Sequence, residues 1–481
     1  MVESWATSGV DLHLEPVGPG GLRRGLTDAL RDAVRTGRLA PGTRLPSSRA
    51  LAADLGIARN TVGEAYADLV AEGWLTARQG SGTRVAERTV VPPSDPARRP
   101  RVPPRPTHNL VPGTPDLAAF PRAEWARAAR RALTAAPNDA LGYGDPRGRV
   151  ELRTALAGYL ARVRGVRADP DNLVITAGFS HALRLLGPVL RARGADSVAV
   201  ESYGLDAYWG LLQTAGLATP ALPWDELGTD TGPLTTEGAV LLTPAHQFPM
   251  GMPLHPDRRA AVVDWARRTD SLVLEDDYDG EFRYDRQPVD PTPWQHRGDA
   301  ALRQRLPVGA LQALDPEHVV YMGTASKSLA PGLRLGWMVL PSSLVEECAS
   351  AKGHSDTCGV LDQLTLAEFL NSGAYDRQVR RMRMRYQRRR NELVGVLAAQ
   401  APHLSVSGAA AGLHVLLELP PGTERSVIQA AVWQGLALKG LGDFRLPDAA
   451  GPVRDALVIG YGTPADSEWA GALDALLRVL P

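Results

Sequence analysis

One lysine directly follows an apolar stretch, in the sequence VVYMGTASK that ends at Lys327. Small polar residues flank this lysine, and Arg334 follows seven positions later in GTASKSLAPGLRLGW. Burial and nearby positive charge both lower the pKa of a lysine amine, and an amine activated in this way forms Schiff bases with aldehydes. The alternative is an ordinary surface lysine, but lysine is rare in this arginine-rich chain. We therefore take Lys327 as a candidate for covalent attachment of an aldehyde.

A second chemical pattern is the acidic end of LVLEDDYDGEFRY (272–284). Asp276 comes where an apolar run ends, and a carboxylate there could pair with a protonated ring nitrogen such as that of pyridoxal 5'-phosphate (PLP). Tyr278 could hydrogen-bond the phenolic oxygen of the same ring. The alternative is a metal site in the EDDYD cluster, but no histidine or second carboxylate group stands at convincing spacing. We expect a PLP site and no metal.

Two glycine-containing stretches are each weak signals of an anion site. TAGFSHAL (176–183) predicts a strand, a glycine turn and the start of a helix, whose backbone N–H groups and Ser180 could bind a phosphate ester. LGYGDPRGRVELRTALAGYL (141–160) adds Tyr143 and a glycine-rich turn before a predicted helix. Their value lies in their order along the chain relative to Asp276 and Lys327.

The elements that must position these residues are short apolar runs that alternate with amphipathic helical stretches. The runs cover 173–178, 197–202, 239–244, 272–278 and 319–326. This alternation predicts an α/β fold with a mainly parallel central sheet wrapped by helices. In such sheets ligands bind beyond the carboxyl ends of the strands. The chemically interesting residues fall at those ends.

The first part of the chain has a different pattern. GLRRGLTDALRDAVRTG (21–37) predicts an amphipathic helix with Leu22, Leu26, Leu30 and Val34 on one face. APGTRLPSSRALAADLG (40–56) predicts a turn and a short helix capped by Ser47 or Ser48, and IARNTVGEAYADLVAEG (57–73) predicts a second helix. Two short helices joined through such a glycine turn form a helix-turn-helix, and WLTARQGSGTRVA (74–86) predicts a two-stranded wing.

Arg59, Asn60 and Thr61 begin the second of these helices, at the end expected to enter the major groove of DNA. Arg44 and Arg49 stand where phosphates would pass. Between Val17 and Ala86 there are ten arginines against six acidic residues, a modest excess of positive charge. Pattern alone leaves open a small helical protein-interaction domain instead.

Composition sets the broad limits. The 481 residues allow two or three domains, and 53 basic against 53 acidic residues give a net charge of +0, so the overall charge points to no polyanionic partner. The two cysteines, Cys348 and Cys358, argue against a disulfide scaffold and a cysteine-rich metal site. The first residues, MVESWATSGVDLHLEP, do not resemble a signal peptide, and no apolar run approaches the roughly 18 residues of a membrane span. We expect a cytoplasmic protein that does not enter a membrane.

A proline-rich stretch, VPPSDPARRPRVPPRP (91–106), separates the two patterns. Prolines favour extended conformations, so a semi-rigid spacer is expected. Its four arginines could lie near DNA phosphates or could simply be solvated. We predict a DNA-binding domain over 1–86, a linker over 87–107 and a ligand-binding domain over 108–481.

The segment from Gly37 to Ala86 resembles the winged helix-turn-helix of the GntR superfamily over its whole length. The resemblance implies DNA contacts by Arg49, Arg59, Asn60, Thr61 and the wing residues Gln79 and Gly80. Gly63 stands where some relatives place another DNA-contacting arginine.

The four chemical stretches, in their order, resemble the fold-type-I PLP aminotransferases over nearly all of residues 108–481. The resemblance implies that Lys327 carries PLP as a Schiff base, that Asp276 binds the pyridine nitrogen and that Tyr278 binds the ring hydroxyl. It assigns the phosphate to Gly178, Phe179, Ser180, Thr324, Ser326 and Arg334. Tyr143 matches a tyrosine that reaches the phosphate of the neighbouring subunit, which implies a homodimer.

A GntR-like domain joined through a linker to an aminotransferase-like domain resembles the MocR/GabR family of regulators. This implies a PLP-dependent regulator, not an enzyme, that binds double-stranded operator DNA and responds to PLP or to an amino-compound effector. The ligand would shift the protein between two conformations through its different affinities for them. The alternatives are an active aminotransferase with a DNA-binding appendage, and a constitutive DNA-binding protein with a vestigial PLP fold.

Several positions depart from the aminotransferase pattern. Leu205 stands where relatives have a tyrosine that stacks on the cofactor, and Tyr203 or Tyr208 could substitute for it. TPAHQFPMG (243–251) replaces an Asn-Pro-Thr-Gly loop, so His246 or Gln247 could take the ring contact. Arg454 is the nearest candidate for binding an effector carboxylate.

Two further segments are ambiguous. DPTPWQHRGDAALRQRLP (290–307) looks inserted and could be a surface excursion or a lid that shapes effector choice. DRQVRRMRMRYQRRRNEL (376–393) could be a second DNA surface or, as we favour, a solvated or subunit-interface helix.

Overall fold

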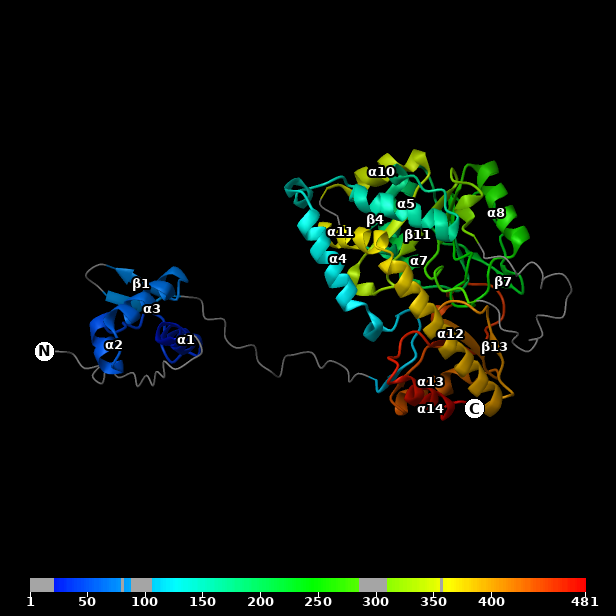
Figure 1. The fold of residues 1–481 in the computed structure, drawn as a ribbon. Coiled ribbons are helices and arrows are strands. Elements are labelled where there is room, and N and C mark those ends of the chain that lie inside the picture. Colours follow the sequence, from blue (N-terminus) through cyan, green and yellow to red (C-terminus); the bar gives the residue numbers. More distant parts are fainter. Residues whose placement is uncertain (1–20, 79–81, 88–105, 285–308, 355–357) are drawn as a thin grey trace. The chain divides into compact units, whose positions relative to one another are not determined.

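The computed structural model describes residues 21–78, 82–87, 106–284, 309–354 and 358–481, and the chain divides into two compact units, Met1–Pro103 and Pro104–Pro481 (Figure 1). Gln79, Gly80, most of the linker predicted at 87–107 and the inserted segment 290–307 lie outside the described residues. The two units are treated separately below.

The smaller unit contains α1 (Gly21–Arg35), α2 (Ser48–Leu55), α3 (Arg59–Ala71), β1 (Leu75–Arg78) and β2 (Gly82–Val85). Ser47 is the N-cap of α2, because its hydroxyl accepts a hydrogen bond from the Ala50 amide at 3.2 Å. Gly56, with φ of 64°, ends α2 in the left-handed conformation that glycine tolerates best. β1 and β2 pair antiparallel, which confirms the predicted wing.

The core of this unit lies between α1 and α3. Leu26 and Leu30 are buried as predicted, together with Val62 and Leu69 of α3, whereas Leu22 in the first turn of α1 is 51% exposed. Arginines of α1 also hold α3: Arg23 pairs with Asp68 and Glu64, and Arg31 pairs with Glu72. Much of the acidic charge of this unit is thus neutralised internally.

The larger unit is built on a seven-stranded sheet in the order β4-β12-β11-β10-β9-β5-β6. Its strands are β4 (Leu173–Thr176), β5 (Val198–Glu201), β6 (Ala221–Leu222), β9 (Ala239–Leu242), β10 (Leu272–Asp276), β11 (Val319–Thr324) and β12 (Gly336–Val339). Only β12 runs antiparallel to its two neighbours, β11 and β4. The five apolar runs are therefore strands of a mainly parallel sheet, as predicted.

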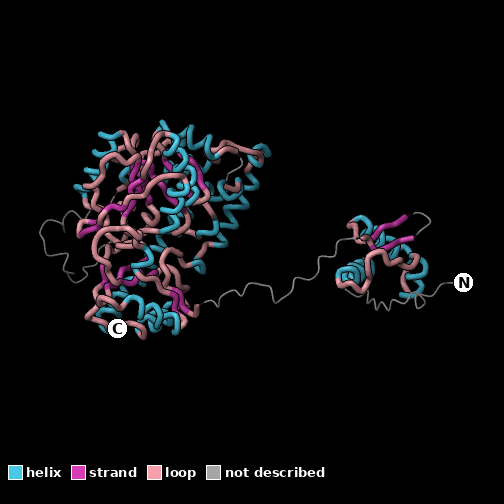
Figure 2. The backbone as a smooth tube through the Cα atoms, turned by 180° about the vertical axis from the view of Figure 1, so that it is seen from behind, coloured by secondary structure: helices cyan, strands magenta, loops and turns pink. Residues whose placement is uncertain are grey.

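Helices cover both faces of this sheet, and Figure 2 shows its strands enclosed by them. They are α4 (Arg122–Ala135), α5 (Val150–Arg164), α6 (Phe179–Ala192), α7 (Asp206–Thr214), α8 (Pro256–Thr269), α10 (Ser342–Lys352) and α11 (Val360–Asn371). Alternate strand residues enter different cores: Leu173 and Ile175 pack in one cluster and Val174 in another. Burial of both faces explains why these strands are continuously apolar in the sequence.

A smaller C-terminal part follows the long helix α12 (Ala374–Gln400), which joins it to the sheet-bearing part (Figure 1). It contains the antiparallel strands β13 (Val406–Ser407), β14 (His414–Glu418) and β16 (Ala456–Gly460), with α13 (Glu424–Trp433) and α14 (Trp469–Leu477). Here β3 (His108–Asn109) pairs with β15 (Leu436–Ala437). The remaining elements are the short pair β7 (Trp224–Asp225) and β8 (Gly228–Thr229) and 3-10 turns at 117–119, 138–141, 170–172, 311–313, 331–333 and 441–444.

The arginines of α12 are used largely within the protein. Arg389 is fully buried and pairs with Asp116 at 3.0 Å and Asp466 at 2.6 Å, and Arg385 pairs with the same two carboxylates. Arg383 donates to the Glu281 carbonyl. The structure thus favours a packing helix over a second DNA surface at 376–393.

Within the described ranges, no helix has both the length and the apolar character needed to cross a membrane.

Candidate functional site

Three strand ends meet at one edge of the large sheet. The register pairs Thr176 of β4 with Gly336 of β12, and Gly336 with Thr324 of β11. The residues that follow β4 and β11 and those that precede β12 therefore share this edge. These are the three segments that carry the predicted phosphate ligands.

Gly178 leaves space for an anion at this edge. It is the N-cap of α6 with φ of 91°, and no side chain caps the helix. A Cβ at Gly178 would lie 3.3 Å from Arg334 Nη1. The first-turn N–H groups at Phe179 and Ser180 and the guanidinium of Arg334 thus serve the same edge, an arrangement that suits a phosphate.

Thr324 and Ser326 complete the predicted phosphate set. Their hydroxyl groups lie 2.7 Å apart, and the Ser326 amide donates to Thr324 Oγ1 at 3.1 Å. The structure therefore gathers all six predicted phosphate residues at one sheet edge.

Lys327 follows directly and is partly buried. Burial lowers the pKa of its amine, and the nearby carboxylates Asp276 and Asp279 oppose that shift. Its Nζ donates to the carbonyl oxygen of Gly113. A partly desolvated amine at this position has the property required for Schiff-base chemistry.

Asp276 ends β10 beside β11 and is 6% exposed. Burial raises the pKa of its carboxyl well above the usual value; Lys327 opposes the shift and nearby carboxylates add to it. Its Oδ1 is buried and has no hydrogen-bond partner among the described residues. A buried acceptor that lacks a donor is costly, and the protonated ring nitrogen of PLP would supply that donor. The residues present therefore fit PLP.

The other carboxylates of the EDDYD run have separate partners. Glu275 accepts from the amides of Leu311 and Gln312, and Asp277 pairs with Arg164. Asp279 contacts His246. The carboxylates diverge, which removes the basis for the alternative metal site, and the described part of the chain holds no cluster of three or more potential metal ligands.

The hydrogen bonds of loop 243–251 distinguish His246 from Gln247, the two candidates for the ring contact. The Gln247 amide is fully engaged, since it donates to the carbonyls of Tyr203 and Phe248 and accepts from the Met250 amide. His246 Nδ1 lies 3.0 Å from the Tyr278 hydroxyl. Gln247 thus shapes the loop, whereas His246 adjoins the residue predicted to bind the ring.

Tyr208 of α7 contacts one of the predicted phosphate residues. Its ring packs against that of Phe179, with centroids 4.6 Å apart. Burial raises the pKa of its hydroxyl, the charge of Asp276 raises it further, and the charge of Arg334 opposes the shift. Tyr203 instead is buried with Met250 and Phe444 in a separate apolar cluster. Of the two predicted substitutes for a stacking residue, the geometry favours Tyr208.

Arg454 does not take the place expected for an effector-binding residue. Its guanidinium pairs with Glu418 and lies 5.0 Å from the ring of Trp224. Because β14 and β16 are antiparallel, Glu418 is at the opposite end of β14 from His414, about 13 Å away. His414 lies at the end of β14 nearer to Lys327: burial is the main cause that lowers the pKa of His414, and the charge of Lys327 contributes to the same shift. The structure does not support the expected carboxylate contact by Arg454.

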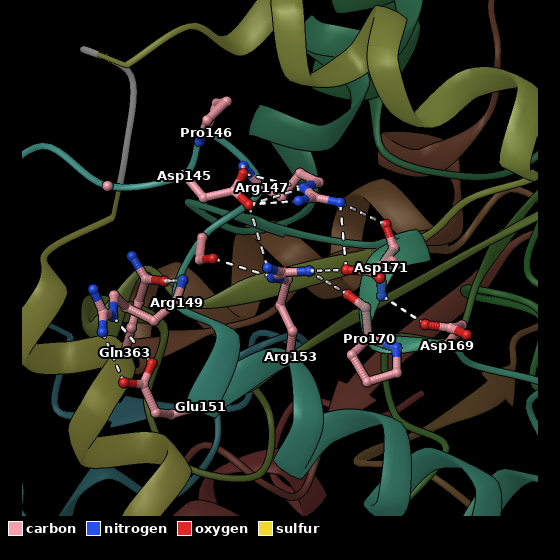
Figure 3. A network of polar contacts seen from close by, with 12 residues as sticks. Asp145, Pro146, Arg147, Arg149, Glu151, Arg153, Asp169, Pro170, Asp171 and Gln363 are labelled. Atoms are coloured by element: carbon pink, nitrogen blue, oxygen red, sulfur yellow. Dashed lines mark hydrogen bonds and ion pairs between the residues drawn. The ribbon is translucent and has the colours of Figure 1, made fainter. Parts of the chain in front are cut away.

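Tyr143 is 93% exposed, and a polar network holds the base of its loop (Figure 3). Arg153 is 3% exposed and joins Asp145 to the Pro170 carbonyl, and Arg147 pairs with Asp145 at 2.7 Å. The Arg149 amide donates to Gln363 Oε1 at 2.8 Å, which ties the loop to α11. The loop is thus firmly supported while its tyrosine points to solvent.

Two groups at the site had no clear signal in the sequence. Gly113, with φ of 100°, presents its carbonyl to Lys327 from a segment more than two hundred residues earlier. Arg283 has buried Nε and Nη2 atoms without a hydrogen-bond partner among the described residues, and it contributes to the charge environment of Tyr278 and Asp279. An arginine in the motif EFRY could have been noticed, but nothing in the sequence marks it as buried.

Comparison with known proteins agrees with both units. The family "Bacterial regulatory proteins, gntR family" matches residues 22–85, and "Aminotransferase class I and II" matches residues 109–447. The HTH-type pyridoxine biosynthesis transcriptional regulator PdxR of Corynebacterium glutamicum is 32% identical over 94% of this chain and 94% of its own. The probable rhizopine catabolism regulatory protein MocR of Rhizobium meliloti is 32% identical over 86% of this chain and 85% of its own.

The chain belongs to the MocR/GabR family of transcription regulators. It is therefore a DNA-binding regulator with an aminotransferase-like domain.

Solved structures support the fold of the larger unit of this MocR/GabR regulator. An archaeal alanine:glyoxylate aminotransferase matches with a TM-score of 0.65 at 22% identity, over 78% of this chain and 90% of that one. The α-aminoadipate aminotransferase LysN of Thermus thermophilus, solved with N-(5'-phosphopyridoxyl)-L-leucine, matches with a TM-score of 0.63 at 25% identity, over 77% and 91%. Both are aminotransferase folds.

The residues of this MocR/GabR regulator that are predicted to contact DNA and that the structure describes lie on the smaller unit. Arg59 and Asn60 are exposed in the first turn of α3, where Ala58 provides no side-chain cap and no acidic residue is present. Thr61 follows and is partly exposed. The positive end of α3 is therefore open to an anionic or polar partner.

Arg44 lies shortly before α2, and Arg49 lies in the first turn of α2. Both side chains are exposed, and the backbone of Arg44 forms an antiparallel β-bridge with that of Arg84 in the wing strand β2. The structure thus brings Arg44 to the wing and Arg49 to α2, positions that suit contacts with the DNA backbone.

Arg59→Ala is expected to weaken binding to the operator by about 1–3 kcal/mol and to relax its sequence preference, because a bidentate base contact would be lost. The measurement is fluorescence anisotropy on operator and scrambled DNA at one fixed salt concentration. Arg35→Ala is the matched control, since Arg35 is an exposed arginine paired with Asp32 on α1. Equal losses in both variants would contradict a specific role for Arg59.

Glu201 is a buried carboxyl group that acts on the pKa of Asp276, and its own titration can be tested. Its carboxylate accepts from Thr229 and Thr243, and burial raises its pKa from 4.5 to about 7. The folded protein therefore keeps a proton that the unfolded chain releases, so this contribution to stability is complete below pH 4.5 and is lost as pH rises through 7.

Glu201→Gln has no such proton. Between pH 4.5 and 7, the unfolding free energy of the wild type is expected to fall, relative to that of the variant, by about 1.4 kcal/mol for each unit by which the pH rises. Urea titrations at several pH values measure the difference. Parallel pH profiles for the two proteins would show that Glu201 does not titrate in this range.

Proposed function

We propose that this MocR/GabR regulator carries PLP on Lys327 and uses it, alone or after reaction with an amino compound, to control operator binding. The observation that carries the proposal is the buried Asp276 Oδ1, an acceptor that has no donor among the described residues and lies near a partly desolvated lysine. The relative matched over 94% of both chains is named a regulator of pyridoxine biosynthesis, which favours PLP itself as the signal.

Each residue of the site has a distinct role in this proposal. Bound PLP supplies an aldehyde and an electron-withdrawing ring. Lys327 would hold PLP through its amine, and Asp276 would hold the ring nitrogen in its protonated form. Tyr278, whose pKa burial raises well above its usual value, stays a phenol and would donate to the ring oxygen. The phosphate would be held by Gly178, Phe179, Ser180, Thr324, Ser326 and Arg334.

The segment from Thr107 to Asp116, which we call the strap, gives a route from this site toward the DNA-binding unit. It begins within the first residues of the larger unit, and Gly113 contacts Lys327 six residues after it starts. Asp116 anchors the other end through Arg385, Arg389 and the Tyr386 hydroxyl. A lysine amine that condenses with an aldehyde loses hydrogens as water leaves, so its donation to Gly113 must change. Loading of Lys327 would thereby alter the strap.

A homodimer is part of the proposal, because Tyr143 and Leu141 are 93% and 57% exposed beside a hollow of about 430 Å³. A second copy would cover these residues and bring Tyr143 to its partner's site. Leu141→Asp is expected to raise the monomer fraction at least several-fold in sedimentation experiments, because it buries a charge in the interface. Val432→Asp, at a 70% exposed apolar residue of α13, is the control. A wild-type monomer would overturn the dimer.

The deciding experiment is a footprint on DNA upstream of the gene for this protein, with and without PLP. Protection that changes in extent or spacing with PLP would support a regulator that senses the cofactor. Identical protection would point to a separate amino compound, to be found by screening. Absence of protection in all conditions would remove support for this operator.

A working aminotransferase remains the second candidate, since Lys327, Asp276, Tyr278 and Arg334, which the aminotransferase resemblance requires, are all present in this chain. Turnover of a common amino acid that survives deletion of residues 1–86 would favour it. Loss of measurable turnover in the PLP-loaded full-length protein would count against it.

A further inference from the structure

A buried cluster of His246, Tyr278 and Asp279 adjoins the ring-binding residues. His246 and Asp279 are each 1% exposed. His246 Nδ1 lies 2.7 Å from Asp279 Oδ2 and 3.0 Å from the Tyr278 hydroxyl. The histidine comes from the loop 243–251, and the other two residues come from the segment after β10. Nδ1 of His246 therefore lies within hydrogen-bond distance of two oxygens, Oδ2 of Asp279 and the hydroxyl of Tyr278.

The charges in the cluster decide where the Nδ1 hydrogen lies. Burial is the largest single influence and would raise the pKa of Asp279, but the charge and hydrogen bond of His246, together with the charges of Arg283 and His414, keep that pKa below its usual value. An ionised carboxylate only accepts hydrogen bonds, so Nδ1 must carry the hydrogen and donate it to Asp279. Nδ1 then has no lone pair for the proton of Tyr278.

The Tyr278 proton is therefore left for another acceptor. Burial, followed by the charges of Asp279 and Asp276, raises the pKa of Tyr278 well above its usual value, so the side chain remains a phenol. Asp279 is the competing acceptor, because the Tyr278 hydroxyl can also donate a hydrogen bond to its carboxylate. While His246 occupies Oδ2 of Asp279, that competition is reduced.

We propose that the His246–Asp279 pair is a positioning device that keeps the Tyr278 hydroxyl available to the ring oxygen of PLP. His246 acts through Tyr278 and is a positioning residue. The inference rests on the proposed attachment of PLP to Lys327.

The surroundings leave this role to His246 alone. Gln247 has no amide group to spare. His414, whose ring centroid is 5.2 Å from that of His246, contacts the Pro249 carbonyl, and burial followed by the charge of His246 lowers its pKa to about 3. Arg283 also lies near Tyr278 and Asp279, Asp276 acts on Tyr278, and Lys327 and Asp279 act on each other.

The backbone fixes the pair in place. Gly412 has φ of 72°, and a Cβ there would lie 2.4 Å from Asp279 Oδ2 and 2.4 Å from His246 Cε1. Gly251 approaches His246 from another side, where a Cβ would lie 3.6 Å from Nε2. The close packing of two glycines limits the His246 ring to a narrow range of positions.

The expected consequence concerns the proton that the lysine nitrogen shares with the ring oxygen of PLP. A hydroxyl that donates to that oxygen stabilises its negative charge and so weakens its hold on the proton. Removing the donor should therefore raise the pH midpoint of the visible absorption of the PLP-loaded protein. Without His246, Asp279 would compete for the Tyr278 proton and weaken the donation.

The test compares His246→Gln with His246→Asn. The asparagine amide nitrogen can stand near the former Nδ1, whereas the longer glutamine side chain reaches toward the former Nε2. We expect the glutamine variant to raise the midpoint by about one pH unit, the loss of roughly one charged hydrogen bond, and the asparagine variant to restore most of the wild-type value. His414→Gln, at the neighbouring buried histidine, should leave the midpoint in place.

The outcomes separate the two proposals. If the wild-type protein gains no visible band with PLP, the proposed function fails. If the band forms but its midpoint is the same in wild type and His246→Gln, the inference is overturned.

A measurement on the wild-type protein covers the case in which the variants do not fold. Nitrogen NMR of His246 without PLP should show hydrogen on Nδ1. A bare Nδ1 would also overturn the inference, because the Tyr278 proton would then go to His246.

Discussion

Lys327→Ala is expected to abolish the visible absorption that PLP produces with the wild-type protein and to remove any effect of PLP on the footprint. The alanine has no amine to condense with the aldehyde, although Asp276 and the phosphate residues remain. DNA binding in the absence of PLP should be retained, because the DNA-binding residues belong to a separate compact unit. Spectra after gel filtration, paired with footprints, measure both effects.

Lys439→Ala is the control for this experiment, because Lys439 is 46% exposed and pairs with Asp443, which is not one of the predicted ligands. Lys327→Arg adds information: arginine can still donate to Gly113 but cannot form a Schiff base. If the arginine and alanine variants differ in DNA binding without PLP, the strap contact matters by itself. A visible band that persists in Lys327→Ala would disprove attachment at this lysine.

Arg164→Met is expected to destabilise the larger unit by about 3–5 kcal/mol, because it leaves a buried carboxylate unpaired. Arg164 and Asp277 are 6% and 1% exposed, and Arg164 Nε and Nη2 lie 2.6 and 2.9 Å from the two carboxylate oxygens. The Tyr321 hydroxyl also donates to Asp277 at 2.7 Å. Thermal and urea unfolding of the larger unit measure the loss.

Arg162→Met supplies a matched control on the same helix, since Arg162 is 59% exposed and pairs with Asp376. Exposed pairs contribute at most about 1 kcal/mol, so little change is expected. The double variant Arg164→Met with Asp277→Leu should recover much of the loss, because no unpaired buried charge remains. Similar stability of Arg162→Met and Arg164→Met would refute a strong buried pair.

The sequence predicted the sheet and the gathering of ligands because those features depend on local patterns. Runs such as 173–178 and 319–326 are apolar on both faces, which only a covered strand requires. The predicted phosphate residues come directly after β4 and β11 or before β12, and antiparallel pairing of β12 with both neighbours brings these three ends together. Residues as distant as Ser180 and Ser326 were assigned together through the resemblance to aminotransferases, and not from the strand pattern alone.

Other positions depended on register and on distant partners. Arg454 precedes a predicted strand, but only the antiparallel pairing with β14 shows which end of the site it occupies. The choice between His246 and Gln247 required the hydrogen bonds of both side chains. Gly113 lies in a segment without any helical or strand pattern, so its contact with Lys327 had no sequence signal.

The strap also sets where this protein can be divided. β3 pairs with β15, Thr463 donates to the carbonyls of Val111 and Thr114, and the Gly460 amide donates to the Leu110 carbonyl. The residues of the strap precede α4, the first α-helix of the larger unit, yet they pack in its C-terminal part. A chimeric regulator that exchanges DNA-binding domains should therefore be joined before residue 104. A junction placed just before α4 would remove a strand and a ligand-site wall together with the old domain.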